Sequence, residues 1–185
     1  MLSREKLFSI LKENLKSENL IKHSLAVEAG MESLAEYLGE DKERWALAGL
    51  LHDIDYERTK ENPQLHSRLG AKMVEELTGD KEIAEAILTH NEEHKILPKS
   101  KMGKALYCLD SLTGLIVAAT LVLPSKKIKD LKVENVLKRF KEKSFARGAN
   151  RETILKCKEY LGLELEKFVE IVLSAMQKIS DKLGL

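Results

Sequence analysis

Apolar residues recur three or four positions apart along almost the whole chain, and this period constrains the fold more than any other feature. Between residues 18 and 38, for example, Leu20, Val27 and Leu34 fall on one face of a helix. We find no sustained alternation of apolar and polar residues, which a half-buried strand would show. Aromatic residues make up only 5% of the composition, which argues against an all-β sandwich. The sequence therefore predicts an all-α fold, a bundle of helices.

Capping and breaking residues divide this pattern into successive helices. Gly39, Pro63, Pro98 and Gly162 stand near the expected boundaries. The stretch 41–53 is apolar nearly all round, so we expect it at the centre of the bundle. The expected helices cover 3–16, 18–38, 41–53, 63–78, 80–94, 100–124, 131–145, 151–160 and 164–183.

The length of 185 residues predicts a single domain over residues 1–185, in which helices of 126–185 pack on a core at 18–125. The amphipathic stretch 164–183 can pack on its own bundle or on a second chain, so a homodimer is an open alternative. Cys108 and Cys157 lie in apolar helical patterns, and we expect both to be buried thiols.

The charges nearly balance, with 31 Lys and Arg against 30 Asp and Glu. Nothing in this balance favours a nucleic-acid polymer as a partner, although a small anionic ligand needs only a few basic residues. The first residues lack the pattern of a secretory signal, and the longest apolar run, 111–123, is too short to span a bilayer. We therefore expect a cytoplasmic protein with no membrane partner.

All five histidines fall within the first 94 of the 185 residues, within or beside amphipathic helical patterns. A single inward histidine is more often a hydrogen-bonded core residue than a metal ligand. Several inward imidazoles from different helices would need separate polar partners among aliphatic side chains, whereas one or two metal ions satisfy them together. The histidines are His23, His52, His66, His90 and His94.

Asp53 and Asp110 each lie in strongly apolar sequence. Burying an unpaired carboxylate is costly, and a divalent cation is the partner that best offsets the burial of both. Two alternatives stay open, in which Asp53 ends its helix facing solvent and Asp110 pairs with Lys104.

The order His23, His52-Asp53, Asp110 resembles the HD superfamily, in which these residue types bind a divalent metal. The resemblance covers about residues 18–125, and 48–55 (AGLLHDID) looks like the family signature. It implies an HD-domain helical bundle with a C-terminal helical extension. In binuclear members, Asp53 would bridge two ions, and His66 and His90 would hold the second. Asp55-Tyr56 stands where the cyclic-dinucleotide branch has Gly-Lys, so such a substrate is discounted.

The resemblance implies a metal-dependent phosphohydrolase that cleaves a phosphomonoester or phosphodiester of a small phosphorylated substrate, which we interpret as a nucleotide. Asp53 and His52 would be its catalytic residues, and water its nucleophile. Asp55 or Glu57 is a candidate proton carrier. One or two divalent ions are expected, without a choice among Fe, Mn, Ni, Co, Zn and Mg.

A phosphate also needs donors opposite the metal, and a few basic residues are candidates for substrate binding. Gly114 is expected either to admit substrate or to allow close helix packing. We expect His94 to lie at the surface or to support the metal ligands, with substrate binding as a further candidate role. We interpret Glu92 and Glu93 as solvated charges. The basic candidates are Arg68, Lys104, Arg147 and Arg151.

Two other functions stay open. Some members of the same superfamily bind two irons and oxidise their substrate with dioxygen. Alternatively, the chain is a non-catalytic helical module that retains a structural metal.

Overall fold

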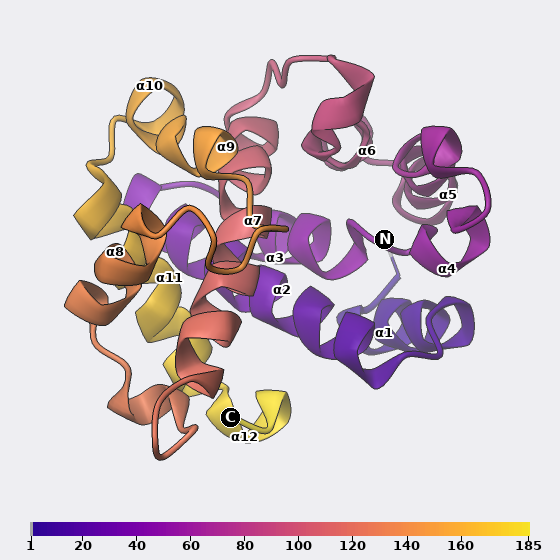
Figure 1. The fold of residues 1–185 in the computed structure, drawn as a ribbon. Coiled ribbons are helices and arrows are strands. Elements are labelled where there is room, and N and C mark those ends of the chain that lie inside the picture. Colours follow the sequence, from indigo (N-terminus) through magenta and orange to yellow (C-terminus); the bar gives the residue numbers. More distant parts are fainter. Residues whose placement is uncertain (1) are drawn as a thin grey trace.

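The computed structural model describes residues 2–185, and every regular element in that range is a helix, as the all-α prediction requires (Figure 1). The longer helices are α1 (Arg4–Asn14), α2 (Glu18–Leu38), α3 (Lys42–Leu51), α5 (Arg68–Thr78), α6 (Lys81–His90), α7 (Lys101–Leu121), α8 (Val133–Lys141) and α11 (Leu165–Lys178). The shorter elements are α4 (Tyr56–Thr59), α9 (Arg151–Leu155), α10 (Cys157–Leu161), α12 (Ser180–Leu183) and the 3₁₀ turns η1 (Pro63–Leu65), η2 (Glu92–His94) and η3 (Ile128–Asp130).

Polar side chains cap the starts of the helices that the sequence marks most clearly. Asp41 accepts a hydrogen bond from the backbone N–H of Arg44, and Asp80 accepts from those of Glu82 and Ile83. These side chains satisfy N–H groups that have no partner within the helix. At the other end of α2, Gly39 has a φ of 72°, a left-handed conformation that glycine adopts without strain.

The core forms where α2, α3 and α7 pack together, with α6 against α3 and α7. The approach of α3 to α2 is so close that it requires Gly49. A Cβ added to Gly49 would lie 2.8 Å from the Val27 carbonyl oxygen and 2.9 Å from the Glu28 Cα. This contact brings the last turn of α3 next to the middle of α2, one turn after His23.

Helix α7 runs through the interior of the bundle between α2, α6, α9 and α10 (Figure 1). By length and composition alone, this helix of 21 residues could cross a membrane. The apolar run at 111–123, on which the expectation from the sequence rested, is too short to do so. Leu106, Leu109 and Leu112 are fully buried within the bundle, as in the core helix of a folded domain.

The C-terminal helices cover the core formed by the earlier ones. Phe168 and Val172 of α11 are fully buried, and α11 packs along α2 and α7. The Gln177 side chain donates to the backbone carbonyls of Ile128 and Leu131, which fixes η3 against α11. Cys108 and Cys157 are buried as free thiols, and this burial raises the pKa of Cys157 to about 11.

Four of the expected helices are interrupted. The expected helix at 63–78 begins as η1, then breaks at Ser67 with a φ of 66° before α5. The expected helix at 80–94 ends at His90, because Asn91 is extended and its side chain caps η2. The helices expected at 151–160 and 164–183 each divide into two, near Lys156 and Ile179.

Candidate metal centre

Helix α3 ends at Leu51, so His52 and Asp53 lie in the turn that follows it. The turn is held by backbone hydrogen bonds, from the Ile54 N–H to the Leu51 carbonyl and from the Tyr56 N–H to the Asp53 carbonyl. His52 is fully buried and Asp53 is 6% exposed. Because the backbone turns here, two adjacent side chains point into the same cluster, which a continuous helix would not allow.

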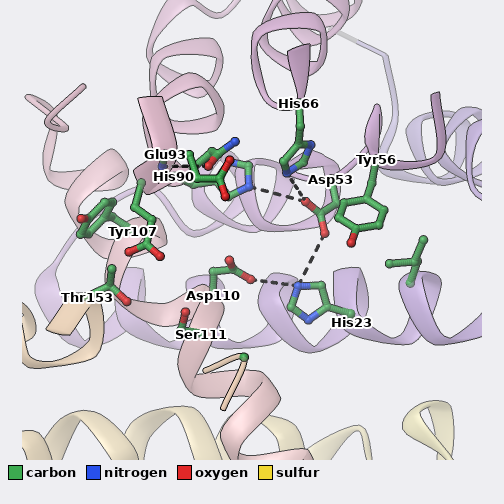
Figure 2. A pocket seen from close by; sticks show the side chains of 14 residues that line it. His23, Asp53, Tyr56, His66, His90, Glu93, Tyr107, Asp110, Ser111 and Thr153 are labelled. Atoms are coloured by element: carbon green, nitrogen blue, oxygen red, sulfur yellow. Dashed lines mark hydrogen bonds and ion pairs between the residues drawn. The ribbon is translucent and has the colours of Figure 1, made fainter. Parts of the chain in front are cut away.

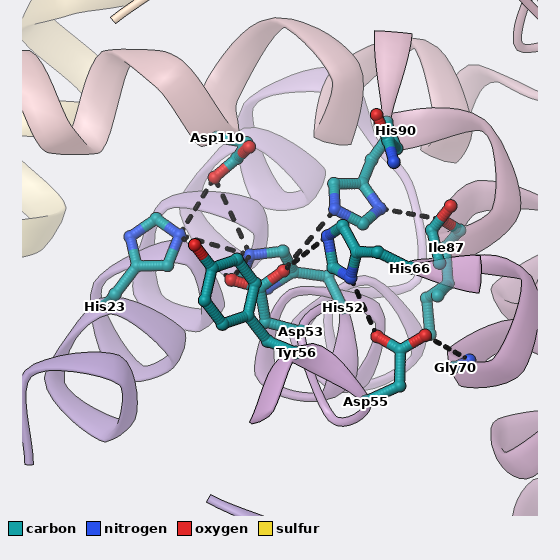
Figure 3. Close-up of polar contacts among 12 residues, drawn as sticks. His23, His52, Asp53, Asp55, Tyr56, His66, Gly70, Ile87, His90 and Asp110 are labelled. Atoms are coloured by element: carbon teal, nitrogen blue, oxygen red, sulfur yellow. Dashed lines mark hydrogen bonds and ion pairs between the residues drawn. The ribbon is translucent and has the colours of Figure 1, made fainter. Parts of the chain in front are cut away.

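His23, His52 and Asp110 form the first half of the cluster (Figure 3). Asp110 Oδ1 lies 2.9 Å from His23 Nε2 and 3.6 Å from His52 Nε2. The two Nε2 atoms are 3.2 Å apart. The three ligand atoms all lie within 4.8 Å of one another, which is close enough to share one ion.

Asp53 lies between this half and a second one. Its Oδ2 is 3.3 Å from His52 Nε2 and 3.7 Å from His23 Nε2. Its Oδ1 is 3.3 Å from His66 Nε2 and 3.5 Å from His90 Nε2. His52, Asp53 and His90 form a second trio within 4.8 Å. One carboxylate thus faces a different set of imidazoles with each oxygen.

The outer nitrogens of these imidazoles are occupied by other groups. His52 Nδ1 donates to the Gly49 carbonyl at 2.8 Å, and His90 Nδ1 donates to the Ile87 carbonyl at 2.6 Å. His66 Nδ1 donates to Asp55 Oδ1 at 2.9 Å, and His23 Nδ1 lies 3.3 Å from the Thr113 hydroxyl. A proton on Nδ1 leaves the Nε2 lone pair directed at the centre, the arrangement that metal-binding histidines adopt.

This donor set fits a divalent metal. Without a cation, Nε2 lone pairs 3.2 Å apart repel each other, so the cluster needs either protons or a metal between them. Burial lowers the pKa of His52, but Asp53 and Asp110 outweigh burial and hold that pKa well above its ordinary value. Burial raises the pKa of Asp110, but hydrogen bonds from His23 and His52 outweigh it and hold that pKa far below its usual range.

Asp55, a candidate proton carrier from the sequence, does not line the cavity beside the cluster. It is fully buried on the far side of His66 from Asp53 (Figure 3). Its Oδ2 accepts from the Gly70 N–H at 2.7 Å. Glu57, the other candidate, accepts from the backbone N–H of Ser17 at 2.8 Å, and neither acid lines the cavity beside the cluster.

His94 lies in η2, because α6 has already ended at His90. Its Nε2 donates to the backbone carbonyl of His66 at 2.7 Å. The Ser67 hydroxyl, next in the chain, donates to the Leu88 carbonyl at 3.1 Å. These contacts hold the segment that carries His66, so the structure gives His94 a supporting position.

A cavity of about 360 Å³ opens beside the cluster and exposes it to solvent (Figure 2). Its lining includes two tyrosines that the sequence did not indicate, Tyr107 and Tyr56, whose ring packs edge-on against His66 with the ring centroids 5.3 Å apart. Glu92 and Glu93 also line this cavity from η2, and both are exposed to solvent, as expected. The other lining residues outside the cluster are Leu20, Asn91, Ser111, Gly148 and Thr153.

The basic residues expected to bind substrate do not line this cavity. Arg68 and Arg147 are exposed elsewhere on the surface. The Lys104 amine lies over the Tyr160 ring at 5.7 Å and does not pair with Asp110. Arg151 donates to the carbonyls of the loop before it, including Ala146 and Ala149 at 2.6 Å. Its guanidinium therefore organises the loop that carries Gly148.

The chain belongs to the HD domain family, because residues 20–120, more than half of its length, match the model of that family. This is a superfamily of metal-dependent phosphohydrolases, and its domains bind divalent metals. Among curated proteins the chain resembles the Ribonuclease Y of Lawsonia intracellularis, with 32% identity over 139 residues. The Ribonuclease Y of Thermotoga petrophila is 30% identical over 139 residues.

These alignments cover 74% and 73% of the chain but only 26% and 27% of the two relatives. The Ribonuclease Y of Geobacter sulfurreducens aligns over 98 residues, which is 53% of this chain and 18% of that protein. The chain thus spans about a quarter or less of the length of these relatives.

Proposed function

We propose that this chain is a hydrolase that cleaves a phosphoester with water, using two divalent ions bound by His23, His52, Asp53, His66, His90 and Asp110. The observation that carries the proposal is the position of Asp53, whose two oxygens face two separate sets of imidazoles. A bridging carboxylate is what a two-ion centre needs, since one residue must contact both ions.

Bound divalent ions would lower the pKa of water and polarise a phosphoryl oxygen. The protein supplies the rest of the chemistry. Asp53 and His52 hold the centre from a buried turn, and their backbone contacts limit its movement. Asp110 and His23, whose side chains are 28% and 26% exposed, stand at the cavity side, where a phosphate can enter.

The donor set narrows the choice of metal. Four imidazole nitrogens suit Mn, Fe, Co, Ni or Zn, whereas Mg²⁺ prefers an all-oxygen shell that includes several waters. We therefore propose a transition metal at this centre.

We propose a nucleotide phosphoester as the substrate. The name of the relatives states that those proteins cleave RNA, which goes against our expectation that no nucleic-acid polymer is bound. Phosphodiesters of nucleotides therefore belong among the candidate substrates. Glu92 and Glu93 at the cavity disfavour a long polyanion on that side, because like charges repel. Cytoplasmic location and a homodimer stay predictions.

The proposal is tested by removing one ligand. Purified protein is loaded with Mn²⁺ and assayed on p-nitrophenyl phosphate and bis(p-nitrophenyl) phosphate, with metal content measured in parallel. We expect His52→Ala to lose both metal and turnover while keeping its helical circular dichroism. Glu57→Gln is the control and should retain both, because Glu57 lies outside the cavity.

Full metal content and activity in His52→Ala would overturn the site. Dioxygen consumption without ester hydrolysis, in protein loaded with Fe²⁺ in place of Mn²⁺, would instead support the di-iron oxygenase. A metal-loaded protein that neither hydrolyses nor oxidises these compounds would support the non-catalytic module.

A further inference from the structure

Two more cavities adjoin the metal centre, and both include His23 in their walls. The first, here called the side cavity, has a volume of about 300 Å³ and also contains Asp110, Ser111 and Gly114. The second, here called the distal groove, has a volume of about 480 Å³ and lies between α2, α7 and the segment around α12. Both share Gly114 of α7, and the distal groove continues along that helix to Val117 and Leu121.

Small residues keep the side cavity open. A Cβ added to Gly114 or to Gly148 would meet no atom within 4 Å. The remaining wall comes from the loop that Arg151 holds, through Ala146 and Ala149. The volume next to Asp110 is thus accessible to a group attached to a bound phosphate, within the size range of ordinary ligand sites.

The distal groove has apolar walls and a single cationic side chain. Val117, Leu121 and Leu183 contribute apolar surface. Among the described residues that line the three cavities, Lys22 is the only lysine or arginine. It precedes His23 directly, so their Cα atoms are about 3.8 Å apart.

The Lys22 side chain lines the groove beside Gly184, and its amine is available to a ligand. A Cβ added to Gly184 would lie 3.0 Å from Lys22 Nζ, so the ammonium rests against the end of α12. The ion pairs within residues 2–185 use other lysines, such as Lys42 and Lys101, and none uses Lys22. Lys22 is also half-buried, which strengthens its attraction for an anion relative to a fully solvated lysine.

We propose that Lys22 binds a second phosphate of the substrate, one nucleoside away from the phosphate that lies at the metal centre. This inference rests on the proposed hydrolase function and adds its substrate class, a nucleotide with two phosphates joined through a nucleoside. The intervening sugar and base occupy the side cavity and the apolar part of the distal groove. A 5′-phosphorylated dinucleotide and the end of an RNA strand share this chemistry.

The test compares substrates with and without the second phosphate. Metal-loaded protein is assayed on a 5′-phosphorylated dinucleotide, a ten-nucleotide RNA, a nucleoside monophosphate and bis(p-nitrophenyl) phosphate. Lys22→Gln keeps the length of the side chain without its charge, and Lys22→Arg keeps the charge. Lys72→Gln removes an equal charge from the exposed face of α5 and is the matched control.

We expect Lys22→Gln to raise KM for the dinucleotide by about tenfold or more, as for loss of a charge-assisted hydrogen bond. Turnover of bis(p-nitrophenyl) phosphate should change less than about twofold, because this ester has no second phosphate. Lys22→Arg should restore most of the affinity, and Lys72→Gln should match the wild type. Cleavage of the dinucleotide alone would identify the short substrate, and comparable KM values for the RNA would identify a strand end.

An equal loss on all substrates in Lys22→Gln would overturn the inference and leave the hydrolase proposal intact. So would a wild-type protein that binds the dinucleotide no more tightly than the monophosphate. If no ester is hydrolysed, the hydrolase proposal fails by itself. In that case, the phosphate site at Lys22 is tested by the binding of a phosphorothioate dinucleotide to the metal-loaded protein. Equal affinity in the wild type and in Lys22→Gln would exclude this site.

Discussion

Asp55 fixes the ring of His66 from behind, accepting its Nδ1 proton at 2.9 Å while its other oxygen accepts the Gly70 N–H at 2.7 Å. A single buried carboxylate thereby joins the turn after α3 to the first turn of α5. The His66 imidazole is left with Nε2 facing Asp53. The second half of the candidate centre depends on a residue that itself lies outside the cavity.

Replacing Asp55 by alanine should weaken this half selectively. The Gly70 N–H and the His66 Nδ1–H would both lose a buried acceptor, at a cost of about 2–4 kcal/mol in the free energy of unfolding. Loss of such a partner typically lowers metal affinity about 10–100-fold. Urea denaturation and titration calorimetry with Mn²⁺ measure the two effects, with Glu57→Ala as the control. Unchanged stoichiometry and affinity in Asp55→Ala would contradict this role.

The metal-free protein should lose stability in alkaline solution through His66. Burial lowers the pKa of His66, but hydrogen bonds to Asp53 and Asp55 outweigh burial and raise it to about 9. The unfolded value is about 6.5. Because the folded pKa is the higher one, the contribution is fully present below pH about 6.5 and is lost as the pH rises through about 9.

Urea denaturation with EDTA between pH 6 and pH 10 measures this loss. His66→Gln removes the titrating group and should flatten the profile over that window. In the same window, metal binding to the wild type should strengthen with pH, since the ion must displace protons. A wild-type profile parallel to that of His66→Gln would disprove the assignment.

Gly49→Ala should destabilise the whole bundle. Its Cβ would press on the backbone of α2 at Val27 and Glu28, and backbone cannot move aside as a flexible side chain can. We expect a loss of about 1–3 kcal/mol, the usual cost of overpacking. Thermal unfolding by circular dichroism is a sufficient measurement. Gly114→Ala is the matched control, because open space at Gly114 and a helical backbone should make alanine neutral or stabilising.

Arg151→Met should loosen the loop of residues 142–150 while leaving the metal ligands in place. The guanidinium donates to several carbonyls of that loop, and Gly148 of the loop lines the cavity. We expect KM for a nucleotide ester to rise several-fold with metal content unchanged. Equal KM values for Arg151→Met and wild type would show that the loop does not contact substrate.

The sequence predicted the helical stretches, although four of them are interrupted, because apolar periodicity is a local pattern. It also predicted the six clustered residues, from the cost of burying polar groups and from the family resemblance. The positions of Asp55, His94 and Arg151 were not predictable in the same way. The roles of Asp55 and His94 come from breaks in the backbone at Asp53, Ser67 and Asn91, and that of Arg151 comes from the loop it contacts at 142–150. Apolar periodicity reports neither feature. Proximity to a ligand along the chain suggested that Asp55 acts in the site, yet the turn directs it to the opposite side of His66.

Lys22 shows a further limit of sequence reasoning. Nearness along the chain to His66 and Asp110 favoured Arg68 and Lys104, whereas the lysine on the cavity walls adjoins His23. Only the packing of α12 against α2 places that amine in a groove.

The ligands of the candidate centre come from five separate segments of the chain. These are α2, the turn after α3, the segment around His66 between η1 and α5, α6 and α7. An ion held by all of them would act as a cross-link between parts of the chain that meet only in the native state. Its binding free energy would then add to the resistance of the protein to unfolding and to proteases. Chelation would remove this protection from the whole molecule at once, far beyond the neighbourhood of the cavity.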